Sequence, residues 1–323
     1  MRRRVSRRFF HSMPMNWILA TLQASIAFFD AWMSQLYDVV MLDPISYQNG
    51  TIWEIVSKIY DALMGPAVSI LVIGFYLALI HDSGEFIKTR RASSIAWTFI
   101  LLCITATLLQ GGKYVLLLIF WCFKEILQTV TGPNGTNFLD LSWVELPQQV
   151  KLATAGLGAT KATLFFIVTL IFSLVILVCG FTIIMVVYGR LFNIYLHIAV
   201  APLALACGAA GPLRSTFAAY LRSFVGVCLQ GVVIVVVCMI FSAFANNFDF
   251  NTVQTEQIAE LKEDMTEEEF SDWWEQWGMS SKELEAKKAE VLWAYLSQML
   301  FLYLVMAGMI KGADSWIHQK LNL

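Results

Sequence analysis

The stretch ATLFFIVTLIFSLVILVCGFTIIMVVY, residues 162–188, decides the fold. It carries no charged side chain, and about 20 mostly apolar residues are enough for a helix to cross the hydrocarbon core of a bilayer. Helices serve there because every backbone N–H and C=O group must be bonded within the protein. Four further stretches are long and apolar with few or no charges: 62–80, 95–123, 224–245 and 291–310. The sequence therefore predicts an all-α, polytopic transmembrane protein.

The composition supports this class. Of the 323 residues, 58% are hydrophobic and 14% are charged, whereas soluble domains have about 45–50% apolar and about 25% charged residues. A cytosolic enzyme, a disordered tail and a fibrous protein are therefore excluded. The 6 cysteines form neither a C-x-x-C pair nor the spacing of a secreted disulfide framework, so we expect them to be buried apolar residues.

The N-terminal segment, residues 1–42, is basic at its start and carries a polar stripe. A signal peptide is disfavoured because Gln23 interrupts the apolar run 17–29 and no small-residue cleavage site follows it. The stripe falls at steps close to one helical turn; its polar members are Gln23, Asp30, Ser34 and Asp38. Such a helix either lies in the membrane interface or crosses the bilayer with the stripe facing a pore or a partner. Crossing would bring the number of spans to about six.

Positive charges near span ends predict the topology. Lys88, Arg90 and Arg91 place residues 81–94 in the cytoplasm and residues 43–61 outside. The N-terminal arginines agree with this map if the first helix crosses the membrane, which favours crossing. Both termini are then cytoplasmic, and residues 124–161 form an external loop of the membrane core, residues 43–246.

Lys113 lies in the middle of the 95–123 span, next to two glycines. A lysine at the bilayer centre costs about 2.5–3.5 kcal/mol on insertion scales unless it finds a polar environment or a carboxylate. One interpretation is a local kink at residues 110–113 from which Lys113 reaches an interface. The other is that Lys113 faces an aqueous or intersubunit seam.

The region 190–222 is predicted to hold a broken or re-entrant helix. Proline removes a backbone donor and clashes with the preceding turn, and broken helices at membrane depth need protein or a cavity around them. The residues that carry this prediction are Arg190, Pro202, Gly208, Gly211, Pro212, Arg214 and Arg222. If the segment turns back, all three arginines stay in the cytoplasm; if it crosses, everything after it inverts.

Residues 247–290 form an acidic insert, with 13 acidic and 4 basic side chains between 249 and 290. Two capping-box patterns, Thr266 with Glu269 and Ser280 with Glu283, predict helices. Four aromatic residues share one face of the first helix, at i, i+3, i+4 and i+7: Phe270, Trp273, Trp274 and Trp277. They either rest on the protein's own loops and the headgroup layer or dock a partner. The last segment, 291–323, is a span with a cytoplasmic end.

Residues with catalytic spacing are missing. The 4 histidines are scattered over different segments, and no metal-ligand or nucleophile motif occurs. We therefore predict no catalytic, cofactor-binding or metal-binding residues, and no enzyme activity. A secondary transporter would be expected to show an internal repeat and paired ionisable residues near the midplane, and the sequence contains neither.

The stretch GRLFNIYLHIAVAPLALACGAAGPLRSTFAAYLRSFVGVCLQG, residues 189–231, resembles the TrbL group, also called VirB-six-like. These are polytopic inner-membrane components of bacterial type IV secretion and conjugation machines. The resemblance implies a homo-oligomeric, noncatalytic channel subunit in the bacterial cytoplasmic membrane. Its implied partners are the lipid bilayer, secretion ATPases and other subunits of the machine, and a single-stranded DNA–relaxase substrate in transit.

Two other functions compete with this interpretation. A transporter or permease subunit would move a small solute without partners. A membrane scaffold would anchor the machine without forming the route for DNA.

Overall fold

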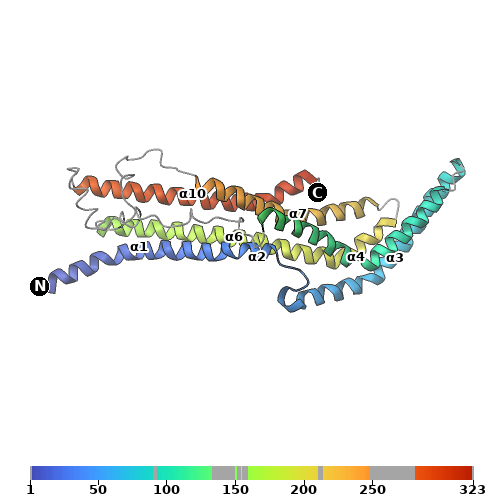
Figure 1. Cartoon of the computed structure of the whole chain (residues 1–323), viewed down its shortest axis with the longest axis horizontal. Coiled ribbons are helices and arrows are strands. Elements are labelled where there is room, and N and C mark those ends of the chain that lie inside the picture. The colour runs from blue at the N-terminus through green and yellow to red at the C-terminus, as the bar shows by residue number, and fades with distance from the viewer. Residues whose placement is uncertain are drawn as a thin grey trace. The chain divides into compact units, whose positions relative to one another are not determined.

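A computed structural model describes residues 2–89, 93–132, 150, 154, 159–209, 214–247 and 281–321. This part of the chain contains helices and no strand, so the all-α prediction is confirmed (Figure 1). Its helices are α1 (Arg2–Ser34), α2 (Leu36–Val40), η1 (Tyr47–Gly50), α3 (Thr51–Thr89), α4 (Ser93–Thr131), α6 (Ala159–Ala206), η4 (Cys207–Ala209), α7 (Arg214–Asn246) and α10 (Ser281–Leu321).

Five helices are long and apolar enough to cross a membrane: α3, α4, α6, α7 and α10. They contain the five stretches that the sequence predicted as spans. The first helix, α1, is not among them. Large apolar side chains are exposed along most of these helices, as expected where lipid rather than water surrounds the protein. The chain is therefore a multi-pass membrane protein of helical type.

The chain divides into two compact units. Unit 1 combines Met1–Leu36, Leu139–Ile184 and Val237–Ile310, and unit 2 combines Tyr37–Phe138, Met185–Val236 and Lys311–Leu323. These units cut across the segments proposed from the sequence, because helices far apart along the chain pack together. The two units are described separately below.

In unit 1, α1 lies lengthwise along α6. The Trp17 ring is 5.8 Å from the Phe166 ring, and the Trp32 ring is 6.3 Å from the Phe181 ring. On each helix, the second contact lies fifteen residues after the first. The two helices therefore run in the same direction.

Helix α10 follows the same direction in unit 1. Phe165 of α6 contacts Trp293, and Phe29 of α1 contacts the later residue Tyr303, with ring centroids 5.8 and 4.6 Å apart. Gly180 of α6 lets Phe29 approach closely, since a Cβ there would stand 3.3 Å from the Phe29 ring. Helices α1, α6 and α10 are therefore mutually parallel in this unit.

This arrangement contradicts the predicted topology. That map requires the first helix to leave the cytoplasm and the 162–188 segment to return to it, which makes them antiparallel. Charge counting near span ends considers each loop separately and contains no information on which helices pair. The relative direction of α1 and α6 depends on packing between side chains about 150 positions apart.

Unit 2 is built on an antiparallel hairpin of α3 and α4. Phe75 contacts Phe99 with ring centroids 5.2 Å apart, and Tyr60 contacts the later residue Leu109. The end of α6 and the start of α7 pack against the base of this hairpin. Their buried side chains form one core with those of α3 and α4, including Leu116, Phe120, Ile198, Leu205 and Phe224.

Helix α6 continues where the sequence predicted a separate broken element. It runs without interruption from Ala159 through Pro202 to Ala206 and ends in η4. Pro202 removes one helical bond, and helix-interrupting prolines are tolerated in membrane helices where neighbouring groups satisfy the freed backbone carbonyl. The chain changes direction after Ala206, and α7 begins at Arg214. Helix α4 is likewise continuous through residues 110–113, so the predicted interruption there is absent.

The parallel pairing of α1 and α6 can be tested by cysteine cross-linking. We expect Trp17→Cys with Phe166→Cys, and Trp32→Cys with Phe181→Cys, to cross-link through a short bifunctional reagent. The exchanged pair, Trp17→Cys with Phe181→Cys, is the matched control and should give no product. Efficient cross-linking of the exchanged pair alone would show that the helices run in opposite directions.

Candidate functional site

Arg190 of α6 is the most buried charged group between residues 189 and 231, with 4% of its surface exposed. Its Nε donates to the Val227 carbonyl of α7 at 3.2 Å, and its Nη1 donates to the Val40 carbonyl of α2 at 3.1 Å. The guanidinium lies 5.9 Å from the centre of the Phe120 ring of α4. A buried charge is tolerated when it is hydrogen-bonded, and these bonds join three helices.

The Val40 carbonyl is available because the helix ends there. Val40 is the last residue of α2, and the last carbonyls of a helix have no helical donor. Arg190 supplies a donor. The Tyr195 hydroxyl donates to the Pro44 carbonyl at 2.9 Å. Two hydrogen bonds, from Arg190 and from Tyr195, therefore hold the end of α2 and the connection after it against α6.

Gly231 of α7 makes room for the Arg190 side chain. A Cβ at this glycine would overlap the guanidinium. Because Gly231 is four residues after Val227, it lies directly beside the carbonyl that Arg190 bonds. The close approach of α6 and α7 therefore depends on an arginine and a glycine that are 41 positions apart.

His197 of α6 and Ser223 of α7 form a polar contact that sequence reasoning missed. His197 Nε2 is 3.1 Å from Ser223 Oγ, and His197 Nδ1 is 2.8 Å from the Asn193 carbonyl. Since a carbonyl only accepts, Nδ1 carries the proton and Nε2 accepts from the serine hydroxyl. The Tyr220 hydroxyl donates to the His197 carbonyl at 2.7 Å. Because His197 and Ser223 are 26 positions apart, no local sequence pattern indicates that they are in contact.

A serine beside a neutral imidazole combines a nucleophile with a base. Ser223 lies in the interior of α7, where neighbouring N–H groups are engaged in helical bonds. Acyl transfer also needs donors aimed at a developing oxyanion, and a helix interior does not offer them. The contact serves as a tie between α6 and α7.

The other residues of the predicted broken region are separated in the structure. Gly208, in η4, packs against Thr105 of α4, whose Oγ1 would be 3.3 Å from an added Cβ. Arg214 begins α7 and, like Arg222, is exposed, in contrast to the buried Arg190. Gly211 and Pro212 lie outside the described residues. The three arginines therefore do not act as one group of loop charges.

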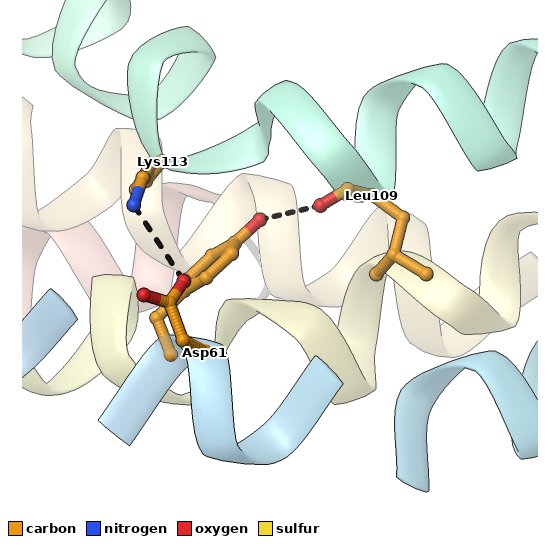
Figure 2. Close-up of polar contacts among 4 residues, drawn as sticks. Asp61, Leu109 and Lys113 are labelled. Atoms are coloured by element: carbon orange, nitrogen blue, oxygen red, sulfur yellow. Dashed lines mark hydrogen bonds and ion pairs between the residues drawn. The ribbon is translucent and has the colours of Figure 1, made fainter. Parts of the chain in front are cut away.

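Lys113 reaches a carboxylate on the neighbouring helix (Figure 2). Its Nζ is 3.6 Å from Asp61 Oδ1, and the lysine side chain is 19% exposed while that of Asp61 is 64% exposed. The Tyr60 hydroxyl beside this pair donates to the Leu109 carbonyl at 2.7 Å. Lys113 Nζ also lies 5.7 Å from the ring centres of Tyr60 and Tyr114. The sequence analysis did not identify Asp61, since nothing local links it to Lys113.

The polar stripe of the first helix is exposed. Gln23, Asp30 and Ser34 lie on the exposed face of α1 in unit 1, and Ser34 Oγ donates to the Ala31 carbonyl at 3.1 Å. Asp38 is exposed too, but it belongs to α2 in unit 2, because α1 ends at Ser34. Asp30 has no hydrogen bond or ion pair with any described residue.

Unit 1 also contains an open groove between α1 and α6, with a volume of about 680 Å³. Trp17 and Phe28 of α1 and Phe166 of α6 border it, and small residues such as Ala20 and Ala24 lie between them. This volume falls in the roughly 300–1,000 Å³ range of ligand pockets. The groove is mainly apolar and holds no cluster of catalytic groups.

The aromatic residues of the acidic insert, Phe270, Trp273, Trp274 and Trp277, lie outside the described residues, as does its first capping box. The predicted roles of these aromatic residues stay predictions. The helix predicted from the second box is present, since α10 begins at Ser281 and contains Glu283. Among the residues that the structure describes, no group of three or more His, Cys, Asp or Glu side chains could hold a metal ion.

No protein-family model, curated protein or solved structure matches the chain. The fold defines the class, a multi-pass α-helical membrane protein.

Replacing Arg190 should destabilise the protein. Arg190→Lys retains the charge, but a single ammonium group cannot reproduce the two-pronged contact, so we expect a loss of about 1–3 kcal/mol. Arg222→Lys, at an exposed position of α7, is the control and should change little. The readout is the midpoint of thermal unfolding in detergent. An unchanged midpoint for Arg190→Lys would show that the contact with Val40 and Val227 is dispensable.

Two adjacent glycines of α4 give a second test. A Cβ at Gly112 would overlap Leu205 of α6 and stand 2.8 Å from the Tyr60 hydroxyl, whereas a Cβ at Gly111 meets nothing within 4 Å. Gly112→Ala should destabilise by about 1–3 kcal/mol through overpacking. Gly111→Ala should be neutral or stabilising by up to about 1 kcal/mol, because alanine favours the helix. Equal effects of the two substitutions would contradict the packing described for Gly112.

Proposed function

We propose that this protein is a noncatalytic, multi-pass membrane component of a type IV secretion machine that supports transfer of a DNA–protein substrate in conjugation. It works as an oligomer with other subunits of the machine, including its ATPases, in the cytoplasmic membrane of a bacterial cell. One observation carries the proposal: a polar stripe is exposed on α1 beside an apolar part of α6.

The exposed surfaces of α1 and α6 differ at the same level. Asp30 of α1 lies two residues before Trp32, which contacts Phe181 of α6. Exposed positions of α6 in this region are large and apolar, as at Leu174 and Val178, and suit contact with lipid. A charged side chain at the bilayer centre costs about 2.5–3.5 kcal/mol on insertion scales. The α1 stripe therefore favours a protein or aqueous neighbour over lipid.

The described polar groups support a noncatalytic role. Arg190, His197 and Ser223 are engaged in ties between helices, and Lys113 is paired with Asp61. This use of polar groups suits a subunit that holds a defined shape within a larger assembly. The resemblance of residues 189–231 to the TrbL group supplies the identity of the assembly and its DNA–relaxase cargo.

Photo-cross-linking in the native membrane tests the assembly. A benzophenone amino acid at Gln23, on the stripe, should yield adducts with a second copy or with another subunit of the machine. The same amino acid at Leu174, an exposed apolar position of α6, is the control and should give no protein adduct. Absence of adducts from Gln23 would contradict the assembled state.

The secretion role has its own readout in the host cell. Deletion of the gene should abolish DNA transfer to recipient cells, and the wild-type chain should restore it. Asp30→Leu should leave the chain membrane-inserted and fail to restore transfer. Undiminished transfer after deletion would overturn the secretion role. Cross-links from Gln23 to transferring DNA would place the stripe on the route, whereas adducts with protein alone would favour a scaffold.

A further inference from the structure

Four charged side chains of the α3–α4 hairpin lie near one level along its axis. Lys113 of α4 pairs with Asp61 of α3, and Glu54 and Lys58 of α3 form an exposed ion pair at 2.8 Å. Because the hairpin is antiparallel, the α3 residues that precede Asp61 lie beside the α4 residues that follow Lys113. Residues 114–121 of α4 are therefore level with an exposed pair of charges.

The part of the hairpin beyond the Asp61–Lys113 pair is free of charge over a long distance. Residues 62–80 of α3 and 93–112 of α4 contain no acidic or basic side chain. At about 1.5 Å per residue, the nineteen residues of α3 extend about 28 Å, close to the roughly 30 Å of a hydrocarbon core. The next acidic residue, Asp82, follows directly at the far end.

The surface of this part is apolar on the sides that face away from the hairpin's own contact. Large exposed side chains cover it, among them Ile73, Tyr76, Ile80, Trp97, Ile100 and Ile104.

Two aliphatic hydroxyl groups of this surface are bonded within their own helices. Ser69 Oγ donates to the Gly65 carbonyl, and Thr107 Oγ1 donates to the Cys103 carbonyl at 2.9 Å. Such back-bonding leaves neither of these two hydroxyls in need of water, which favours contact with lipid. Tyr114, exposed beside Lys113, is of the type enriched where hydrocarbon meets water.

We propose that the acyl chains of the bilayer surround the hairpin over residues 62–80 and 94–112, and that the Asp61–Lys113 pair marks one boundary of the hydrocarbon layer. The later part of the predicted 95–123 span, residues 114–123, lies outside that layer. Lys113 is then an interfacial residue rather than a charge at the bilayer centre. This inference concerns the membrane contact alone and does not depend on the secretion role.

Spin labels at two matched positions of α4 test the boundary. Ile104 and Leu118 are apolar and 55% and 59% exposed, but they lie on opposite sides of Lys113. Each is replaced by cysteine in a Cys103→Ala, Cys122→Ala background, and the full chain is reconstituted into phospholipid vesicles. Collision of the label with oxygen reports lipid, and collision with a water-soluble nickel complex reports water.

We expect the label at 104 to collide with oxygen and to lose access to nickel, and the label at 118 to be accessible to nickel. Access of nickel to the label at 104 would place the hairpin in water. If neither oxygen nor nickel reached that label, protein would cover position 104. Loss of nickel access at 118 would extend the layer past Lys113. Each of these three results overturns the proposal.

A second pair on α3 keeps the test valid if an α4 variant does not fold. Ile73 and Ile55 are 60% and 54% exposed and lie on opposite sides of Asp61. The label at 73 should report lipid, and the label at 55 should report water. The same report from both positions would contradict a boundary at Asp61.

Discussion

A polar group that is buried away from water must find its partner inside the protein, and this constraint organises unit 2. Arg190 shows how it operates. The Val40 carbonyl at the end of α2 has no helical donor, and the buried guanidinium bonds that carbonyl while also bonding Val227. A charge that would be costly alone thereby closes a gap in the backbone bonding. The packing of α6 against α7 and the chain connection after α2 both depend on it.

The charged residues of the membrane segments fall into three groups with different consequences. Arg190 is enclosed and structural. Lys113 meets Asp61 across a hairpin, where the pair coincides with the end of a charge-free stretch. Asp30 is exposed on α1 without a partner among the described residues, which makes its surroundings in the membrane the question that decides function.

The sequence predicted the helices well and their pairing poorly. Uncharged runs such as 162–188 reveal long apolar helices because their length is set by the bilayer. The direction of α1 relative to α6 follows from Trp17 meeting Phe166 and Trp32 meeting Phe181, contacts that leave no periodic trace. The same holds for Asp61 and Ser223, whose partners are 52 and 26 positions away. Pro202 misled the prediction because membrane helices accommodate a proline where neighbouring groups satisfy the freed carbonyl, and α6 continues through it to Ala206.

The central claim is that the protein works by assembling with others around its exposed α1 stripe. Mass measurement of the particle extracted from its native membrane with surrounding lipids tests this most directly. The account predicts a mass of several copies or of this chain together with other subunits. A particle containing one copy of the chain and only lipid would contradict it.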